Sequence, residues 1–598
     1  MRFSAVYLPF VSAGWETTRP GYDVGFKQSL DRKELLEEHG LRASDIYTDL
    51  PKTKDWRMDA DGKNLLTKLR NQHIPNYCGA CWSFAATSAM SDRVNILSGR
   101  VRQTGLSMQV ILNCDKYDDG CHGGDPLTAY QFIHEAGGIP DETCQLYVAE
   151  GHDTGRTCDP VDVCMTCDPD RGCFAQEAYP VWTVKAYGLV NGTEAMMAEL
   201  QRGPITCSIA VTDEFFNLRD FSVFKDVTGD QDLDHSISVV GYGEEADGTK
   251  FWIGRNSWGE YWGEFGFFRI VRGENNLGIE SNCQWAIPDS EPTIRTVQRS
   301  VEPPIVAKEH TCVRTPNDWE LADKISPVLG SRPDSANLPA TYDFRNVSGS
   351  TSFWTEDKNQ HAPKYCGSCW AEAVTSALSD RLSLLNKGAW PPINLSPQVL
   401  INCKFGGDCR GGNPAVAYAQ IHAHGLPDET CQSYSAANEN SCDKIHMCEE
   451  CFAGDSPATF WPGTCHAVER FSKWTVVDYG KVAGADDMKA EIFARGPITC
   501  GLFASDSFMH YNGGHVIEEQ APNKWVVNHE ISIAGWGTDK HGEYWIGRNS
   551  WGTYWGERGW FKIRMHTKNL NVETACSWGV PAPVNTQTPD TPPTVQTV

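Results

Sequence analysis

The stretch NQHIPNYCGACWSF (71–84) occurs again, with few changes, as NQHAPKYCGSCWAE (359–372). Each copy holds two cysteines separated by two residues, and a tryptophan follows the second cysteine. Such a C-x-x-C pair can form a disulfide, hold a metal ion, act as a redox couple, or place a structural cysteine beside a reactive one. The rest of the chain decides between these possibilities.

Similar segments recur along the chain in the same order. Residues 106–124 (LSMQVILNCDKYDDGCHGG) return at 395–412 (LSPQVLINCKFGGDCRGG), and 251–267 (FWIGRNSWGEYWGEFGF) return at 544–560 (YWIGRNSWGTYWGERGW). The sequence therefore predicts two copies of one unit of roughly 235 residues, which is within the usual range for a domain.

We place the first copy at residues 50–285 and the second at 338–580. Residues 1–49 form a leader with signal-like and propeptide-like features, although Pro9 interrupts its short apolar run. Residues 286–337 form a linker rich in Pro and charge, which resembles a propeptide and is open to cleavage. Residues 581–598 form a Pro/Thr-rich tail that has little to bury.

The composition narrows the possible functions. The chain has 598 residues, too many for one hydrophobic core, and 40% of them are hydrophobic, as expected of folded domains. The net charge of −25 argues against a nucleic-acid surface, which needs clustered Lys and Arg. We expect no membrane span, because no apolar run is long enough. The oligomeric state stays open.

The chain contains 23 cysteines, which favours an oxidising compartment. We expect the secretory pathway, with a lysosomal, vacuolar or extracellular destination. Asn191, Asn346 and Asn394 begin triplets of the N-glycosylation type. Cys312 lies between the two copies, and each copy has an odd number of cysteines. Each copy must therefore keep at least one cysteine without a bridge inside the copy.

A helix is expected after each CGxCW. Apolar residues recur there at spacings of three and four, which predicts one buried helix face. These residues are Ala86, Met90, Val94 and Leu97 in the first copy, and Val374, Leu378, Leu382 and Leu385 in the second. Cys81 and Cys369 then stand at a helix N-terminus, where the helix dipole stabilises a thiolate.

A thiolate nucleophile needs a base, and two histidines recur at matching places. His235 (in DLDHSISVVGYG) and His529 (in VVNHEISIAGWG) each open an alternating apolar strand pattern. A single His beside a strand is usually a packed core or turn residue, but here both copies also have GRNSWG further along. Asn256 and Asn549 in this motif can orient the imidazole, and the Trp that follows can shield that hydrogen bond.

Together these motifs resemble those of the papain-like cysteine proteases, whose signature is CG[SA]CW with a distant His and Asn. The resemblance covers nearly all of both copies. It implies an α+β fold with two tandem units, each with a helical lobe that carries the cysteine and a β-barrel-like lobe that carries the His and Asn. It also implies cysteine-type hydrolysis of peptide and protein substrates, in the cleft between the lobes and without a cofactor.

Within this family the chain looks most similar to the cathepsin X branch. An inserted His-Ile-Pro or His-Ala-Pro loop separates the nucleophile from the Gln of the oxyanion hole, Gln72 or Gln360. The resemblance implies that His73 and His361 on this loop bind the C-terminal carboxylate of a substrate. Each unit would then release single C-terminal residues. A papain-like endopeptidase with a tolerated surface loop is the alternative.

The family pattern also implies the disulfides. They are Cys78–Cys121, Cys114–Cys158, Cys144–Cys164, Cys167–Cys173 and Cys207–Cys283, then Cys366–Cys409, Cys403–Cys442, Cys431–Cys448, Cys451–Cys465 and Cys500–Cys576. The linker resembles a propeptide whose cysteine caps the catalytic thiol, which implies a Cys312–Cys369 bridge that keeps the second unit latent. An incidental linker thiol is the alternative. The leader has no cysteine, so the first unit cannot be locked in this way.

Three other functions stay open. A thiol oxidoreductase would use CGAC and CGSC as redox pairs, but it leaves the repeated His and Asn unexplained. Zinc could bind the clip-spaced pairs Cys164–Cys167 and Cys448–Cys451, although bridging in an oxidising compartment explains them equally, so we expect no metal site. A binding module with one inactive copy is the third.

Overall fold

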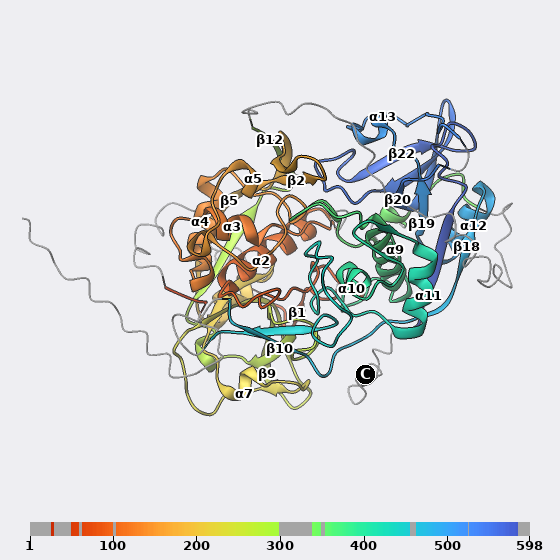
Figure 1. Ribbon diagram of the computed structural model, residues 1–598. Helices are drawn as coiled ribbons and strands as arrows, with labels where there is room; N and C mark the ends of the chain where they lie inside the picture. The colour runs from red at the N-terminus through yellow and green to blue at the C-terminus, as the bar shows by residue number, and fades with distance from the viewer. Residues whose placement is uncertain are drawn as a thin grey trace, which may run out of the picture.

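The computed structural model describes residues 25–28, 49–58, 62–99, 103–297, 338–347, 353–454, 462–523 and 526–583. Figure 1 shows two units side by side, the first coloured red to yellow and the second green to blue. Each unit packs helices against a largely antiparallel sheet, so the predicted α+β class is confirmed. Among the described residues, no helix combines the length and the apolarity needed to cross a bilayer.

The helical lobe of each unit is built around one long helix. This helix is α2 (Cys81–Leu97) in the first unit and α9 (Cys369–Leu385) in the second. The shorter helices of the lobe are α3 (Met108–Cys114), α4 (Pro126–Glu135), α10 (Pro397–Asn402) and α11 (Pro414–His424). Side chains cap all four shorter helices by accepting a hydrogen bond from a first-turn N–H: Ser107, Asp125, Ser396 and Asn413.

The predicted helices are confirmed, but the predicted buried face is one residue too long in each. Ala86, Met90 and Val94 are buried, whereas Leu97 is 53% exposed. In the second unit the equivalent Leu385 is 45% exposed. Both leucines are the last residue of their helix, which extends beyond the part that packs on the sheet.

The second lobe of the first unit is a sheet with the strand order β5-β11-β6-β8-β9-β10-β7, and β1 pairs with β8 off this path. The strands are β1 (Lys54–Asp55), β5 (Val184–Val190), β6 (Ile205–Ile209), β7 (Val223–Phe224), β8 (His235–Glu244), β9 (Lys250–Arg255), β10 (Phe267–Val271) and β11 (Cys283–Pro288). The expected β-barrel-like lobe is therefore an open sheet among the described residues. The end strand β7 has two residues and joins β10 in parallel, so it is too short to close a barrel onto β5.

The second unit repeats this arrangement. Its strand order is β18-β23-β19-β20-β21-β22, and β13 pairs with β20 as β1 does with β8. The strands are β13 (Tyr342–Asp343), β18 (Val476–Val482), β19 (Ile498–Leu502), β20 (His529–Asp539), β21 (Gly542–Arg548), β22 (Trp560–Arg564) and β23 (Cys576–Pro581).

Short elements complete the units. The two-stranded pairs are β2 (Met165–Asp168) with β3 (Gly172–Ala175), β4 (Ala178–Val181) with β12 (Thr293–Thr296), β14 (Gly407–Asp408) with β15 (Gly411–Gly412), and β16 (Glu449–Phe452) with β17 (Thr464–Ala467). The remaining helices are α5 (Pro160–Val163), α6 (Thr193–Glu199), α7 (Asp213–Phe216), α12 (Ala485–Arg495) and α13 (Asp506–Met509), with 3₁₀ turns η2 (Gly120–His122), η3 (His152–Thr154), η4 (Asn276–Gly278) and η6 (Phe344–Asn346).

A buried ion pair joins the two lobes of each unit. The carboxylate of Asp92 on α2 lies 2.6 Å from the guanidinium of Arg255 on β9. Asp380 on α9 and Arg548 on β21 form the same pair at 2.6 Å. Removing one partner of a buried pair typically costs about 3–5 kcal/mol, so these pairs hold the helix against the sheet.

The disulfides among the described cysteines coincide with the ten pairs that the family pattern implies. They are Cys78–Cys121, Cys114–Cys158, Cys144–Cys164, Cys167–Cys173, Cys207–Cys283, Cys366–Cys409, Cys403–Cys442, Cys431–Cys448, Cys451–Cys465 and Cys500–Cys576. Each pair stays within one unit, so the two units are cross-linked independently.

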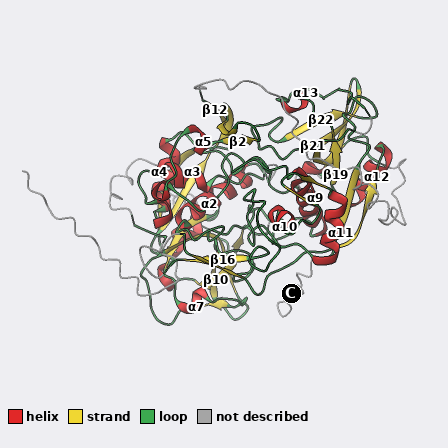
Figure 2. Ribbon diagram, in the orientation of Figure 1, coloured by secondary structure: helices red, strands yellow, loops and turns green. Residues whose placement is uncertain are grey.

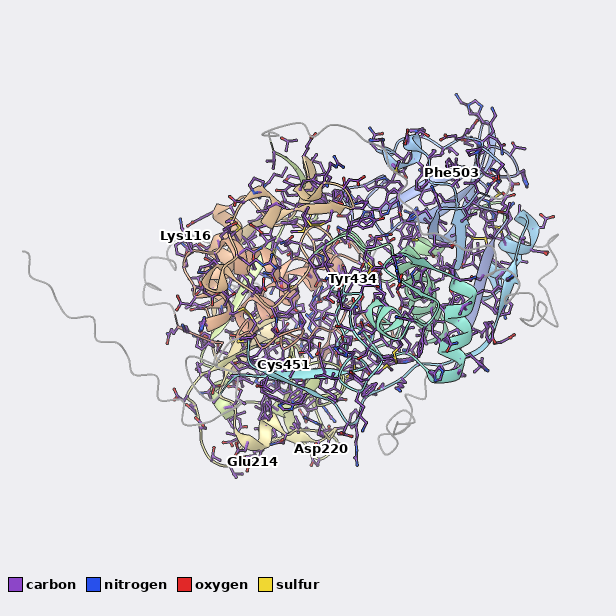
Figure 3. The ribbon with its side chains drawn as sticks, in the orientation of Figure 1. Lys116, Glu214, Asp220, Tyr434, Cys451 and Phe503 are labelled. Atoms are coloured by element: carbon purple, nitrogen blue, oxygen red, sulfur yellow. A yellow bond between two sulfur atoms is a disulfide. The ribbon has the colours of Figure 1, made fainter. Side chains whose placement is uncertain are left out.

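Each unit extends one disulfide-closed hairpin onto the other. The hairpin β16–β17 of the second unit lies against the first unit, where the ring of Phe452 is 6.1 Å from that of Phe216 on α7 (Figure 2). The sulfur of Cys451, labelled in Figure 3, lies 3.6 Å from the carbonyl oxygen of Pro75. In the reverse direction, the sulfur of Cys167 on β2 lies 3.6 Å from the carbonyl oxygen of Pro363. The inserted His-x-Pro loop of each unit is thus covered by the opposite unit.

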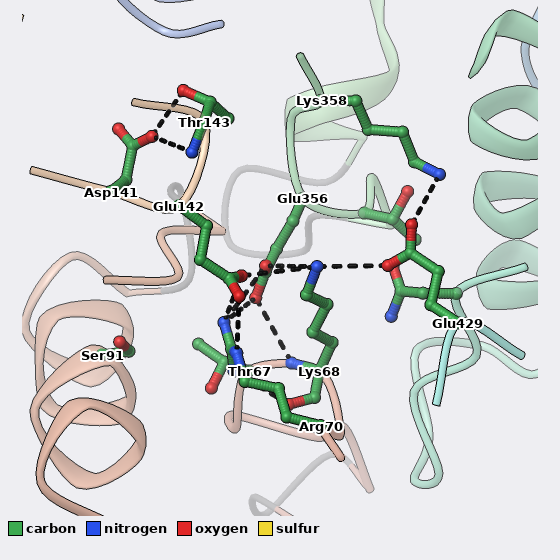
Figure 4. A network of polar contacts seen from close by, with 12 residues as sticks. Thr67, Lys68, Arg70, Ser91, Asp141, Glu142, Thr143, Glu356, Lys358 and Glu429 are labelled. Carbon is green, nitrogen blue, oxygen red and sulfur yellow. Dashed lines mark hydrogen bonds and ion pairs between the residues drawn. The ribbon is translucent and has the colours of Figure 1, made fainter. Parts of the chain in front are cut away.

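Charged side chains also link the units (Figure 4). The ammonium of Lys68 lies 3.2 Å from Glu429 and 3.5 Å from Glu356, and the guanidinium of Arg70 lies 2.8 Å from Glu142 and 3.4 Å from Glu356. Burial alone would lower the pKa of Lys68, but these carboxylates hold it above its usual value. The alternating charges make the contact between the units specific.

Candidate active sites

The two predicted nucleophiles occupy equivalent places. Cys81 is the first residue of α2, Cys369 is the first residue of α9, and both side chains are buried. Cys81 is in the thiol form, whereas Cys369 is disulfide-bonded. Cys312, its predicted partner, lies outside the described residues. The two sites are therefore in different chemical states.

The predicted His–Asn pairs are formed in both units. The Nε2 of His235, at the start of β8, lies 2.8 Å from Oδ1 of Asn256. His529 and Asn549 repeat this contact at 2.8 Å. The backbone N–H of Ser257 donates to the same Asn256 oxygen at 2.8 Å, which fixes the orientation of the amide. Because that oxygen accepts from Nε2, Nδ1 is the nitrogen that can exchange a proton with a thiol.

An indole ring covers each His–Asn pair. The ring centroids of His235 and Trp258 are 4.7 Å apart. The same indole also stacks on His73 of the inserted loop, at 6.1 Å. In the second unit Trp551 lies 4.6 Å from His529 and 5.9 Å from His361. The inserted loop therefore lies on the side of His235 or His529 that carries the tryptophan.

The predicted oxyanion-hole glutamines are buried, and both the nitrogen and the oxygen of each side-chain amide are hydrogen-bonded. The Nε2 of Gln72 donates to the carbonyl of Cys78 at 3.1 Å, and its Oε1 accepts from the hydroxyl of Ser257 at 2.6 Å. Gln360 makes the same contacts with Cys366 at 3.1 Å and Ser550 at 2.8 Å. Neither serine was among the predicted site residues, although each directly follows the Asn of GRNSWG.

The sheet lobe also contacts Cys369, the second predicted nucleophile, directly. The backbone N–H of Glu530 donates to the sulfur of Cys369 at 3.3 Å. Glu530 is the residue after His529, so this contact brings the start of β20 against the start of α9. The cysteine of one lobe and the histidine of the other thus meet at one place.

A short piece of the leader lies over the first site, a contact that the sequence did not predict. The N–H of Phe26 donates to the carbonyl of Asp234 at 3.0 Å, and the carbonyl of Gly25 accepts from Gly124 N–H at 2.8 Å. A Cβ on Gly25 would stand 2.7 Å from the sulfur of Cys81. This segment, residues 25–28, connects the sheet lobe to the helical lobe directly above the thiol, and only glycine fits at its closest point.

The two sites differ in the residues that flank Cys81 and Cys369. In the second unit the hydroxyl of Ser368 hydrogen-bonds that of Tyr434 at 2.6 Å, whereas the first unit has Ala80 at the equivalent position. Glu372 on α9 replaces Phe84 of α2, and burial raises the pKa of its carboxyl to about 7. The surroundings of Cys369 are therefore more polar than those of Cys81.

The disulfides argue against two alternative functions, the thiol oxidoreductase and the zinc site. Cys78 is bonded to Cys121 and not to Cys81, so CGAC is not a closed redox pair. The clip-spaced cysteines belong to separate disulfides: Cys144–Cys164, Cys167–Cys173, Cys431–Cys448 and Cys451–Cys465. A metal clip needs thiolates, which these sulfurs do not offer. The same applies to the sulfurs that lie near the carboxylate of Glu449.

The three glycosylation triplets differ in exposure. Asn191 and Asn346 are exposed. Asn394 is 5% exposed, and its backbone N–H donates to Asp428 at 2.8 Å. A glycan is a bulky surface group, so the structure argues against the predicted site at Asn394 and leaves the other two as predictions.

The family model of the papain family of cysteine proteases matches residues 50–287 and again residues 338–580. These matches cover most of the chain, so the protein belongs to the papain family and contains the unit twice. It is a cysteine-type peptidase by family, with peptides or proteins as substrates.

Among curated proteins, the chain is 42% identical over 254 residues to cathepsin Z of Onchocerca volvulus, covering 41% of this chain and 78% of that protein. It is 31% identical over 306 residues to cathepsin B-like cysteine proteinase 6 of Caenorhabditis elegans, covering 48% and 78%. Each of these similarities spans less than half of the chain.

Similar solved structures include digestive procathepsin L 3 of Tenebrio molitor, with 28% identity and a TM-score of 0.35 over 44% of this chain and 76% of that one. Another is the bromelain protease of Ananas comosus in complex with the E64 inhibitor, with 29% identity and a TM-score of 0.32 over 40% and 99%.

Proposed function

We propose that each unit hydrolyses peptide bonds through a Cys–His–Asn site, formed by Cys81, His235 and Asn256 in the first unit. The observation that carries this proposal is the 2.8 Å contact between each His Nε2 and Asn Oδ1, which lies beneath an indole. Each histidine begins a strand that packs against the helix beginning with the cysteine. Because Nε2 is bonded to the asparagine, Nδ1 of the histidine is the nitrogen that can exchange a proton with the sulfur. Cys369, His529 and Asn549 form the second site.

The reaction follows from the roles of these groups. The helix dipole at the first turn of α2 and the neighbouring His235 favour the Cys81 thiolate, which attacks the carbonyl carbon of the substrate. His235 then protonates the leaving amine, and a thioester forms. Water hydrolyses the thioester with His235 as base. The side-chain amide of Gln72 and the backbone N–H of Cys81 hold the oxyanion, and losing one such donor typically costs on the order of 10²–10³-fold in turnover.

We further propose that both units are carboxypeptidases. The His-x-Pro loop lies on the side of the catalytic histidine that is covered by the tryptophan. The leaving amine would depart on this side. A loop there shortens the cleft on the leaving-group side. The imidazole of His73 or His361 supplies a hydrogen-bond donor for a terminal carboxylate. The 42% identity to cathepsin Z of Onchocerca volvulus supports this assignment, and a papain-like endopeptidase remains the alternative.

The carboxypeptidase proposal is tested with one peptide in two forms, with a free and with an amidated C-terminus. After mild reduction and removal of the leader, we expect the parent protein to release the last residue of the free form and to leave the amide largely intact. His73→Ala with His361→Ala should reduce this preference by about 10–100-fold, because a hydrogen bond to a charged group is lost. His541→Ala, an exposed histidine, is the control. Equal cleavage of both forms at internal bonds would show an endopeptidase.

We propose that the leader keeps the first unit latent without a covalent bond. Replacing Gly25 by Val would place side-chain atoms against Cys81 and Gly79, so the segment would have to leave the site. We expect an irreversible thiol reagent to modify Cys81 at least about tenfold faster in this variant, since a clash of 1.4 kcal/mol already changes an equilibrium tenfold. The exposed Gln28→Ala is the matched control. An unchanged rate would mean that residues 25–28 do not limit access.

We also propose domain limits at residues 50–285 and 338–580, and a place in the secretory pathway. The many disulfides support an oxidising compartment. Cleavage in the linker between these two domains would separate the units and would break no disulfide within either of them.

A further inference from the structure

The His-Ile-Pro loop of the first unit is enclosed by the second unit. The N–H of Tyr77 donates to the carbonyl of Pro462 at 3.1 Å, and the ring of Phe452 lies 6.1 Å from that of Phe216. His73 is 1% exposed as a result. The hairpin β16–β17 therefore forms one wall of the leaving-group end of the first site.

This hairpin brings a carboxylate to the histidine of the loop. The Oε1 of Glu450 lies 2.7 Å from Nδ1 of His73, and the hydroxyl of Tyr261 hydrogen-bonds the same carboxylate. The positive charge of Arg219 also acts on Glu450, and the side chain of Asn71 hydrogen-bonds its carboxylate. Burial raises the pKa of the Glu450 carboxyl, whereas its contacts with His73 and Arg219 act in the opposite direction.

The second site has a similar architecture, with a threonine at the position of Glu450. The contact of Asn71 with Tyr261 is matched by Asn359 and Tyr554, at 2.9 and 3.0 Å. Tyr261 hydrogen-bonds Glu450, whereas Tyr554 hydrogen-bonds Thr166. Thr166 precedes Cys167 in β2 as Glu450 precedes Cys451 in β16.

We propose that Glu450 of the second unit is a positioning residue for substrate binding in the first site, so that the pH range of the first site depends on the second unit. This proposal rests on the carboxypeptidase function. Glu450 acts through His73, and the neutral Thr166 holds the equivalent position in the hairpin that covers the second site.

The direction of the effect follows from the protonation of the imidazole. When the Nδ1–H of His73 donates to Glu450, Nε2 carries a proton only in the doubly protonated, cationic form. A substrate carboxylate can then be bound at Nε2 only by that cation. The ionised Glu450 favours the cation, so it extends carboxylate binding at the first site toward higher pH. Glu450 thus sets the pH above which the first site no longer binds a substrate carboxylate.

The test uses the chain with Cys369→Ser after mild reduction and removal of the leader, so that only the first site can react, and rates are normalised to titrated Cys81. We expect Glu450→Gln to raise KM for a peptide with a free C-terminus about tenfold on the alkaline side, with kcat nearly unchanged. This corresponds to a shift of the alkaline limb of kcat/KM by about one pH unit to lower pH. Glu469→Gln, an exposed carboxylate of the second unit, should change nothing.

A reciprocal variant keeps the test valid if Glu450→Gln does not fold. Thr166→Glu in the chain with Cys81→Ser adds a carboxylate opposite His361, and the alkaline limb of the second site should move to higher pH. If the parent releases C-terminal residues and neither variant moves its profile, Glu450 is structural only and this inference fails. If the parent does not discriminate between free and amidated peptides, the carboxypeptidase proposal has failed instead.

Discussion

Replacing Cys81 and Cys369 together by serine should abolish peptide hydrolysis, with a loss on the order of 10⁶-fold, the loss typical when a catalytic nucleophile is removed. A serine hydroxyl at the same places is far less acidic than a thiol, so His235 and His529 cannot generate the nucleophile. Neither cysteine belongs to a disulfide within its own unit, so the fold should survive. Hydrolysis is measured with a short peptide after reduction and removal of the leader.

The single variants supply the control for this prediction. Cys81→Ser should leave only the activity of the second unit, and Cys369→Ser only that of the first. Thermal unfolding of all three variants should match the parent within a few degrees. If the double variant retained full activity, neither cysteine would be a nucleophile and the proposed mechanism would be wrong.

The second unit should be silent in the intact, oxidised chain and should become active on reduction. We attribute this to the predicted bridge between Cys312 and Cys369, since Cys369 is disulfide-bonded whereas Cys81 is a thiol. A thiolate that is held in a disulfide cannot attack a substrate. Peptide mapping under non-reducing conditions should recover one cross-linked peptide that contains residues 312 and 369.

The Cys312→Ala variant provides the matched comparison. In that variant Cys369 should react with an alkylating reagent in the absence of a reductant, while the modification of Cys81 stays the same. Recovery of Cys312 as a thiol from the intact parent, together with reactive Cys369, would eliminate the lock.

Much of each site could be predicted because its parts recur as short motifs. The cysteine follows a fixed motif and begins a helix, and the Asn stands in GRNSWG. Duplication also made the single histidines significant, since His235 alone is indistinguishable from a packed core residue. The residues of both sites could therefore be predicted because the same motifs occur in both halves of the chain.

Other features depend on contacts that no local pattern encodes. The helix periodicity predicted buried Leu97 and Leu385, but burial depends on where the sheet ends beneath the helix. The placement of Gly25 over Cys81 depends on two backbone hydrogen bonds to loops far along the chain. The pairing of His73 with Glu450 joins residues of opposite units, and Glu450 has a neutral counterpart in the first copy.

The central claim is that the chain holds two cysteine peptidase sites, and labelling with an irreversible thiol-reactive inhibitor tests it most directly. After mild reduction and removal of the leader, we predict two labels per chain, one on Cys81 and one on Cys369, with peptidase activity falling in step. The double serine variant should take up none. A chain that stays fully active when both cysteines are labelled, or one that is labelled at other cysteines only, would contradict the account.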